Sequence, residues 1–251
     1  MYLKEKLMSG QKIAGCMLRV VRNPALFFLA KNAGLDFLMF DCEHGNYDME
    51  TLHDNFITAN ALGMSGFVRV PVGTKEYISR ALDSGASGIM VPMTETVEQA
   101  KALVKWSKYQ PIGDRGFNSV AAHTDYKGGK HDEIMRENNK KVISIAQIET
   151  KLAIENIDAI AAVEGVDALL IGPNDLSISL GIPGDLMNPI EIEAIGVVAA
   201  ACKKHGKAFG LHAAEPLLKK FAKELTLVMN LSDSDFLSAG FRGVRKVCDE
   251  L

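Results

Sequence analysis

Short apolar runs alternate along the chain with stretches in which apolar residues recur at helical spacing. Continuous apolar runs of this length are typical of buried parallel strands, and the stretches between them of amphipathic helices. The predicted strands are Ile13–Val20, Phe37–Asp41, Phe67–Val70, Gly88–Pro92, Val142–Ile148, Ala168–Gly172, Lys207–Leu211 and Leu225–Leu231. Because strands and helices alternate, a parallel sheet is favoured, and eight strands are the number that closes a barrel.

The predicted helices carry their apolar residues on one face. Ala100, Leu103 and Val104 follow the fourth strand at helical spacing, and Ile157 and Ile160 follow the fifth. An open doubly wound sheet would show the same alternation, but the chain lacks a G-x-G-x-x-G fingerprint after an early strand and also lacks a P-loop. We therefore predict an α/β fold, a single (β/α)8 TIM barrel domain over residues 1–251.

Charge and cysteine content argue against several classes of function. The chain has 28 Lys and Arg against 31 Asp and Glu, a net charge of -3 without long runs of like charge, which disfavours a nucleic-acid partner. No stretch approaches the roughly 18 apolar residues of a membrane span, and the cysteines show no C-x-x-C spacing. We expect a cytoplasmic protein that acts on small molecules away from membranes.

Polar residues follow several strands at the end where a barrel of this kind carries its chemistry. The second strand ends in Asp41 and is followed by Glu43 and His44, and the third strand carries Arg69. Each of these residues places a charged or titratable group where the apolar run stops. The pattern predicts that side chains from distant parts of the sequence converge there.

The fifth strand places Gln147 and Glu149 on the same face as Ile145, because strand residues two apart share a face. If Ile145 points into the barrel, both polar side chains emerge at its top. A Gly-Pro pair stops the sixth strand and leaves Asp175 in the loop above it. Two carboxylates without clustered His or Cys make an oxygen-rich site that suits Mg2+ or Mn2+. Glu149 and Asp175 are therefore the candidate metal ligands.

Each of these residues also has a structural interpretation. His44 could cap a helix, Asp175 could cap the helix that follows it, and Arg69 could pair with a carboxylate for structure alone. All of them, with Glu149, would have to be structural at the same end of the barrel for this interpretation to hold. His212 follows the seventh strand and could also face the site.

Six motifs in register resemble the HpcH/HpaI class II aldolase family over nearly residues 10–215. They are Asp41-x-Glu43-His44-Gly45, Arg69-Val70-Pro71, Gly88-Ile89-Met90-Val91-Pro92-Met93, Pro111-x-Gly113-x-Arg115-Gly116, Gln147-Ile148-Glu149-Thr150 and Gly172-Pro173-Asn174-Asp175-Leu176-Ser177. The resemblance implies a phosphoenolpyruvate/pyruvate-type barrel and a divalent-metal-dependent aldolase, with Mg2+, Mn2+ or Co2+ as cofactor. Such an enzyme reversibly cleaves a 4-hydroxy-2-oxo acid to pyruvate and an aldehyde. The resemblance also implies a homo-oligomer, a hexamer.

Carried over residue by residue, the resemblance implies specific roles. Glu149 and Asp175 correspond to the metal ligands, Arg69 to the residue that binds the pyruvate carboxylate, and His44 to the acid/base oriented by Asp41. Substrate contacts are implied for Arg69, Gln147, Gly172, Pro173, Asn174 and Leu211. Asp83 resembles a catalytic aspartate that reaches the site of a neighbouring subunit.

The connection Tyr109–Lys140 is long, irregular and rich in Gly, Asn, Asp and His, and we expect it to cover the site. Its segment Phe117–Tyr126 departs from the family pattern and is expected to contribute to the aldehyde pocket. The aldehyde itself does not follow from the sequence.

Three other functions compete with this hypothesis. A Schiff-base aldolase needs a strand-end lysine, but Lys141 and Lys207 precede their strands. A related barrel lyase would use the same metal ligands on a CoA thioester such as malyl- or citryl-CoA. A non-catalytic barrel would bind a 2-oxo acid as a sensor or scaffold.

Overall fold

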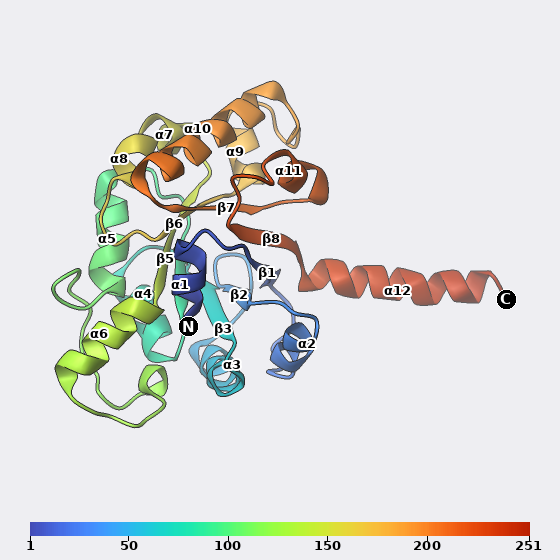
Figure 1. Cartoon of the computed structure of the whole chain (residues 1–251). Helices are drawn as coiled ribbons and strands as arrows, with labels where there is room; N and C mark the ends of the chain where they lie inside the picture. The colour runs from blue at the N-terminus through green and yellow to red at the C-terminus, as the bar shows by residue number, and fades with distance from the viewer.

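The computed structural model describes residues 1–251 and contains a closed barrel whose eight strands are joined in sequence order (Figure 1). The strands are β1 (Ile13–Leu18), β2 (Phe37–Asp41), β3 (Ser65–Arg69), β4 (Gly88–Val91), β5 (Ile143–Ile148), β6 (Ala168–Ile171), β7 (Ala208–His212) and β8 (Leu227–Ser232). All neighbouring pairs are parallel. Each strand overlaps a predicted one, with ends that differ by at most two residues, so the predicted barrel is confirmed.

A helix follows every strand, and a short helix precedes the first one. The helices are α1 (Leu3–Met8), α2 (Leu26–Asn32), α3 (Met49–Leu62), α4 (Lys75–Asp83), α5 (Val97–Ser107), α6 (His131–Lys141), α7 (Lys151–Glu155), α8 (Ile157–Ala161), α9 (Pro173–Ser179), α10 (Pro189–His205), α11 (Glu215–Lys220) and α12 (Asp233–Asp249). A single 3-10 turn spans Ala122–Thr124. None of these helices has the length and apolar character needed to cross a membrane.

Local side chains explain where several helices begin and end. The Asp48 side chain accepts a hydrogen bond from the Thr51 N–H at 2.7 Å at the start of α3. Thr96 and Gln99 form a capping box at the start of α5, which satisfies backbone N–H groups that have no partner inside the helix. Gly206 ends α10 in the left-handed conformation that glycine adopts without strain.

The core has two layers separated by the sheet. Inside the barrel, Phe37 and Phe67 stack with ring centroids 4.5 Å apart. Gly15 and Gly88 make room for these rings, because a Cβ atom at either position would lie only 2.5 or 2.4 Å from a ring carbon. A larger apolar cluster fills the space between the sheet and the surrounding helices. The strands therefore read as nearly continuous apolar runs, because both of their faces are buried.

The long connection lies at the N-terminal end of the strands. It begins after α5 and leads through α6 directly into β5, and its two ends meet where the Tyr109 N–H donates to Asn139 Oδ1 at 2.8 Å. Within it, Arg115 donates to Asp83 at 2.7 Å. The expectation that Tyr109–Lys140 covers the catalytic end, and that Phe117–Tyr126 lines the aldehyde pocket, is therefore wrong within one chain. A connection from helix to strand returns to the opposite end of a barrel.

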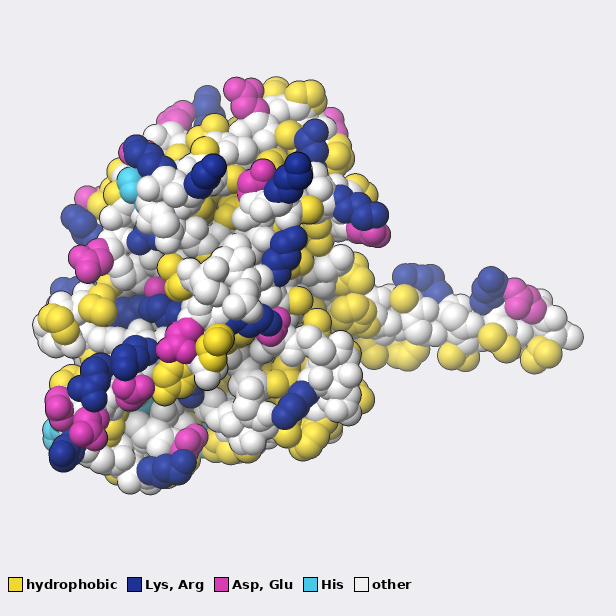
Figure 2. All heavy atoms as spheres, viewed as in Figure 1, with side chains coloured by type: hydrophobic (Ala, Val, Ile, Leu, Met, Phe, Trp, Pro, Cys, Tyr) yellow, Lys and Arg dark blue, Asp and Glu magenta, His cyan; other side chains and the backbone are white.

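The last helix, α12, extends away from the barrel instead of packing against it (Figure 1). Phe236, Phe241 and Val244 on this helix are exposed, and apolar side chains follow one side of the projecting helix in Figure 2. Its first residue, Asp233, is buried and accepts hydrogen bonds from the backbone N–H groups of residues 19–21 at 2.7 to 2.9 Å. These bonds anchor the start of α12 to the loop after β1.

Glu191, in the first turn of α10, is fully buried, and neither of its carboxyl oxygens has a hydrogen-bond partner. Burial raises the pKa of this carboxyl from 4.5 to about 7. The folded chain binds the Glu191 proton more tightly than the unfolded chain does. The contribution of this proton to the free energy of unfolding is therefore fully present below about pH 4.5, and it is lost as the pH rises through about 7.

Glu191→Gln should therefore stabilise the protein relative to the wild type more at pH 8 than at pH 5. A buried amide costs the same at both pH values, whereas the carboxylate must be desolvated only at the higher one. The difference between the two pH values should be about 2–3 kcal/mol in the free energy of unfolding, measured by urea denaturation. An effect of equal size at pH 5 and pH 8 would show that this carboxyl does not control the pH dependence.

Candidate functional site

A cavity of about 330 Å3 opens at the C-terminal ends of the strands. It gathers residues that lie far apart in the sequence, as expected for this end of a (β/α)8 barrel. Seven of the predicted site residues line it, namely His44, Arg69, Gln147, Gly172, Pro173, Asn174 and Asp175.

Glu149 lies directly after β5 and is buried beside this cavity. Ile145 belongs to the cluster inside the barrel, so the predicted alternation along β5 is confirmed. The backbone N–H of Met93 donates to Glu149 Oε1 at 2.7 Å, and the Gln147 side-chain amide donates to Oε2. A Cβ atom at Gly172 would lie 2.3 Å from Oε2, so glycine is required there for the backbone to approach the carboxylate.

Burial raises the pKa of Glu149, and the negative charges of Asp175 and Glu43 act in the same direction. The Met93 N–H and Arg69 oppose them, and together these effects give a pKa of about 7. Asp175 lies in the first turn of α9 and lines the cavity. The two carboxylates are therefore close enough to repel each other. A cation between them would relieve this repulsion.

The residues present fit a divalent metal ion. The side-chain oxygen of Gln147 is buried without a hydrogen-bond partner, which adds a third oxygen beside Glu149 and Asp175. The chain contains no cluster of three or more His, Cys, Asp or Glu side chains that could bind a metal, so this site would rely on two carboxylates. Mg2+ is commonly bound by one or two carboxylates with water or substrate oxygens in its other positions. The donor set thus suits a hard cation and leaves room for a ligand.

Asp41, at the end of β2, holds two arginines at once. Its carboxylate accepts hydrogen bonds from Arg69 Nε at 2.9 Å and Nη2 at 2.6 Å, and from Arg19 Nε at 3.0 Å. The backbone N–H groups of Glu43 and His44 donate to the same carboxylate at 3.2 Å. Burial opposes ionisation of Asp41, but the hydrogen bonds and charge of Arg69, with the His44 N–H and Arg19, hold its pKa below the ordinary value.

Arg69 is buried and presents its guanidinium to the cavity. Besides its two bonds to Asp41, Nη1 lies 3.0 Å from Glu43 Oε2. Burial lowers the pKa of Arg69, but the hydrogen bonds and charge of Asp41, followed by the charges of Glu43 and Glu149, outweigh this effect and raise it. Of the five N–H donors of a guanidinium, two remain available for a ligand. The arginine is thus fixed in place and permanently charged.

The sequence profile of the HpcH/HpaI aldolase/citrate lyase family matches residues 17–233. The chain belongs to this family. A hydroxypyruvate/pyruvate aldolase from Roseobacter denitrificans is 36% identical to it over 83% of this chain and 80% of its own length. A 5-keto-4-deoxy-D-glucarate aldolase from Klebsiella pneumoniae is 35% identical over 84% of this chain and 81% of its own.

The crystal structure of an HpcH/HpaI aldolase from Desulfitobacterium hafniense superposes with a TM-score of 0.95 at 33% identity, over 100% of this chain and 98% of that one. Together these relatives show that this HpcH/HpaI protein is an enzyme of the aldolase class, as the sequence predicts.

The structure places His44 differently from the expected arrangement. Its side chain is 60% exposed, and Nε2 lies 3.8 Å from Glu43 Oε2. Asp41 contacts the backbone N–H of His44 and not its imidazole. In this HpcH/HpaI chain Asp41 therefore fixes the loop that carries His44, while the exposed ring lies in the lining of the cavity beside Glu43.

Two predicted site residues lie away from the cavity. Asp83 ends α4 at the N-terminal end of the barrel, where it pairs with Arg115. Leu211 is fully buried in the layer between sheet and helices, because alternate residues of β7 face opposite sides of the sheet. Its neighbour His212 lines the cavity, and burial lowers the pKa of that histidine.

Arg19, Ser232 and Asp235 also line the cavity, although none of them belongs to the predicted site residues. Of these three, Arg19 carries a positive charge. It follows β1 directly and lines the cavity beside Arg69. The same rule that selected Asp41 and Glu149, a charged residue at a strand end, would have found it. No lysine lines the cavity, and Lys141 and Lys207 lie before β5 and β7, so the lining offers no amine for a Schiff base.

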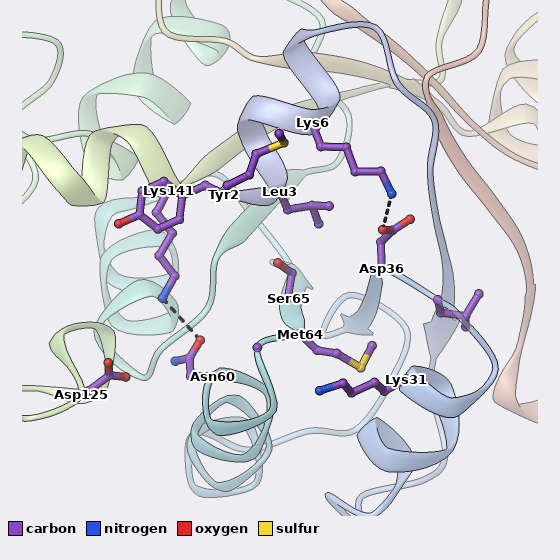
Figure 3. A pocket seen from close by; sticks show the side chains of 13 residues that line it. Tyr2, Leu3, Lys6, Lys31, Asp36, Asn60, Met64, Ser65, Asp125 and Lys141 are labelled. Carbon is purple, nitrogen blue, oxygen red and sulfur yellow. Dashed lines mark hydrogen bonds and ion pairs between the residues drawn. The ribbon is translucent and has the colours of Figure 1, made fainter.

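A larger cavity, of about 580 Å3, lies at the opposite end of the barrel (Figure 3). Its charged side chains already pair with their neighbours. Lys6 Nζ lies 2.6 Å from Asp36 Oδ1, and Lys141 donates to Asn60 Oδ1 at 3.4 Å. The N-terminal face of a (β/α)8 barrel serves stability more than chemistry. We therefore place the candidate active site in the smaller cavity.

Proposed function

We propose that this enzyme is a divalent-metal-dependent aldolase that reversibly cleaves a 4-hydroxy-2-oxo acid to pyruvate and an aldehyde. The observation that carries the proposal is that Asp175 and Arg69 line one cavity and that Glu149 is buried beside it, close enough for both charges to affect its pKa. The two carboxylates suit a hard cation, which would interact with the keto and carboxylate oxygens of a 2-oxo acid. The fixed guanidinium beside them suits the carboxylate of the same substrate. Relatives at 36% and 35% identity that are named as aldolases support the same reaction.

Glu149 and Asp175 would hold Mg2+, Mn2+ or Co2+, and the bound ion would act as a Lewis acid on the 2-oxo group. Arg69 binds the carboxylate of the 2-oxo acid through its two available N–H donors. Asp41 accepts hydrogen bonds from Nε and Nη2 of Arg69 and so keeps the plane of the guanidinium oriented toward the ligand. Gln147 fixes Glu149, and Gly172, Pro173 and Asn174 shape the wall beside the substrate.

His44 acts as the acid/base in this proposal. It takes the proton of the C4 hydroxyl, directly or through a water molecule, while the bond between C3 and C4 breaks and C4 becomes the aldehyde. The electron pair of that bond stays on the three-carbon fragment, which takes up a proton at C3 to become pyruvate. The exposed position of His44 allows it to exchange protons with solvent.

The proposal is tested by offering the purified enzyme a 4-hydroxy-2-oxo acid and, separately, malyl- or citryl-CoA. We expect release of pyruvate from the first substrate and no cleavage of the thioesters. Thioester cleavage without pyruvate release would favour the related CoA-dependent lyase and overturn the proposal.

We also propose that the enzyme forms a homo-oligomer in which α12 packs against a second copy. One face of α12 carries Phe236, Phe241, Val244 and Val247, all of them exposed in the single chain (Figure 2). An exposed apolar stripe of this length is unusual in a monomer. A hexamer is the assembly that the family resemblance implies. A role for Asp83 in a neighbouring subunit's site stays a prediction that depends on this assembly.

The double variant Phe241→Asp with Val244→Asp should form a smaller assembly than the wild type, because it places two charges on the apolar face of α12. Light scattering coupled to gel filtration measures the mass, for comparison with the 27.2 kDa of one chain. Arg242→Asp, on the opposite face of the same helix, is the matched control and should leave the mass unchanged. A wild-type mass of one chain would refute the proposal.

A further inference from the structure

Two successive residues at the end of β8, Leu231 and Ser232, both line the cavity at the C-terminal ends of the strands. Regular strand alternation would turn one of them to the other face of the sheet. The pairing with β1 explains the exception, because Gly15 lies opposite Met229 whereas Met17 lies opposite Ser232. Two steps along β1 thus correspond to three along β8. The end of β8 therefore carries a β-bulge, a feature that re-aims side chains next to a site.

The backbone of Leu231 within this bulge is left-handed, with φ 58°. A leucine adopts this conformation only under strain, and glycine is the usual residue at such a position. Neighbouring side chains hold the bulge in place. His212 Nε2 donates to the Leu231 carbonyl oxygen at 3.2 Å, and the Ser232 N–H donates to Asp235 Oδ2 at 2.8 Å. Backbone strain that is maintained by surrounding bonds is typical of functional positions.

Much of the apolar lining of the cavity comes from β7 and β8, which are neighbours in the barrel. Ala213 and Ala214 follow β7, and Leu231 lies on β8. Leu231 is 45% exposed, and no other large apolar side chain of the lining is exposed to that extent. The hydroxyl of Ser232 already donates to Asp235 Oδ2 at 2.7 Å. This part of the lining therefore offers a contact surface for a carbon chain and few free partners for hydroxyl groups.

The proposed function places the 2-oxo acid end of the substrate on other strands. Arg69 lies on β3, Gln147 on β5, and Asp175 in the helix after β6. The carbon chain that becomes the aldehyde must then contact the remaining lining, to which β7 and β8 contribute. Methylene groups gain from burial against a half-exposed leucine, by roughly 4-fold in affinity for each group. A hydroxyl group in the same place would lose its hydrogen bonds to water without gaining a partner.

We propose that Leu231 is a specificity-determining residue that contacts the carbon chain of the aldehyde part of the substrate. It favours aldehydes whose carbon atoms next to the carbonyl group carry hydrogen and disfavours those that carry hydroxyl groups there. This inference rests on the proposed aldolase function, since it assumes that the 2-oxo acid end binds at Arg69 and the metal ligands. The strained bulge at Leu231 then serves the choice of substrate and not the stability of the barrel.

The test measures kcat/KM for condensation of pyruvate with propanal and glyceraldehyde, and with butanal and erythrose. Aldehydes differ in intrinsic reactivity, so the ratio within each pair of equal length is compared between the wild type and its variants. Leu231→Gly and Leu231→Asn both suit the left-handed backbone, and each should lower the ratio of alkyl to hydroxylated aldehyde about 5- to 20-fold. Leu152→Asn, at a position that is 44% exposed and outside the cavity, is the matched control and should keep the wild-type ratio.

Thermal unfolding separates this role from a structural one. Leu231→Gly should have the Tm of the wild type or a higher one, because glycine adopts the left-handed conformation without strain. A lower Tm together with unchanged ratios would show that Leu231 serves the fold and would overturn the inference.

Exchange of the pyruvate methyl protons with solvent separates the inference from the proposed function, because it needs no aldehyde. If the wild type exchanges these protons but both Leu231 variants keep the wild-type ratios, the inference is overturned and the aldolase function stands. If the wild type neither exchanges the protons nor condenses any aldehyde, the proposed function and the inference fail together.

Discussion

Replacing Glu149 by glutamine is expected to lower kcat/KM for aldol cleavage by on the order of 1,000-fold, the loss of several kcal/mol of transition-state stabilisation. The variant keeps the size of the side chain and the acceptor for the Met93 N–H, but it removes one of the two candidate carboxylate ligands of the metal. Affinity for Mn2+, measured by titration calorimetry, should fall in parallel. The barrel should remain folded, because a neutral side chain at this buried position is easier to desolvate than a charge.

Glu191→Gln is the matched control for this variant. Both glutamates are buried with a pKa raised to about 7, but Glu191 lies in α10 and its carboxyl oxygens have no hydrogen-bond partner, whereas Glu149 contacts the cavity-lining residue Gln147. The control should keep its activity and its affinity for Mn2+. If Glu149→Gln bound Mn2+ as tightly as the wild type and cleaved substrate at a similar rate, Glu149 would not be a metal ligand.

Asp41→Asn is expected to have the largest effect on stability, a loss of about 3–5 kcal/mol in the free energy of unfolding. Asp41 is fully buried, and its carboxylate neutralises the buried Arg69 while also binding Arg19. An asparagine has only one acceptor oxygen, so its NH2 group would face either the donors that now bind Oδ1 or those that bind Oδ2, and the charge of Arg69 would lose its main partner. Because Arg69 would also lose its fixed orientation, KM for the 2-oxo acid should rise.

Urea denaturation measures this loss, with Asp158→Asn as its control. Asp158 also forms ion pairs, with Lys204 at 2.7 Å and His205 at 2.8 Å, but it lies on the surface, where such pairs contribute little. We expect no measurable change for this control. Equal denaturation midpoints for Asp41→Asn and the wild type would show that the arginines do not depend on the buried carboxylate.

The barrel could be predicted because its physical cause is visible in the sequence. Strands that are buried on both faces appear as continuous apolar runs, and the chain contains eight of them. Alternation along β5 also predicted that Gln147 and Glu149 share a face with Ile145, which lies inside the barrel. Both inferences need only the residue pattern within individual strands.

Other features differ from the prediction, and for several of them the sequence already held the necessary signal. The length of Tyr109–Lys140 does not show at which end of the barrel it lies. Leu211 was placed in the site, although alternation along β7 turns it outward and brings His212 to the cavity. The imidazole of His44 was expected to contact Asp41, which the structure shows bound to its backbone instead. Arg19 was overlooked, although it directly follows a strand.

Metal-dependent formation of the pyruvate enolate can be tested by following the methyl protons of pyruvate in D2O by NMR, with the purified wild-type enzyme and no aldehyde. We expect exchange in the presence of Mg2+ or Mn2+, its loss on chelation, and its recovery when the metal is restored. Exchange at the full rate in the presence of chelator would contradict the role given to Glu149 and Asp175. Absence of exchange with Mg2+, Mn2+ and Co2+ alike would contradict the proposed aldolase chemistry itself.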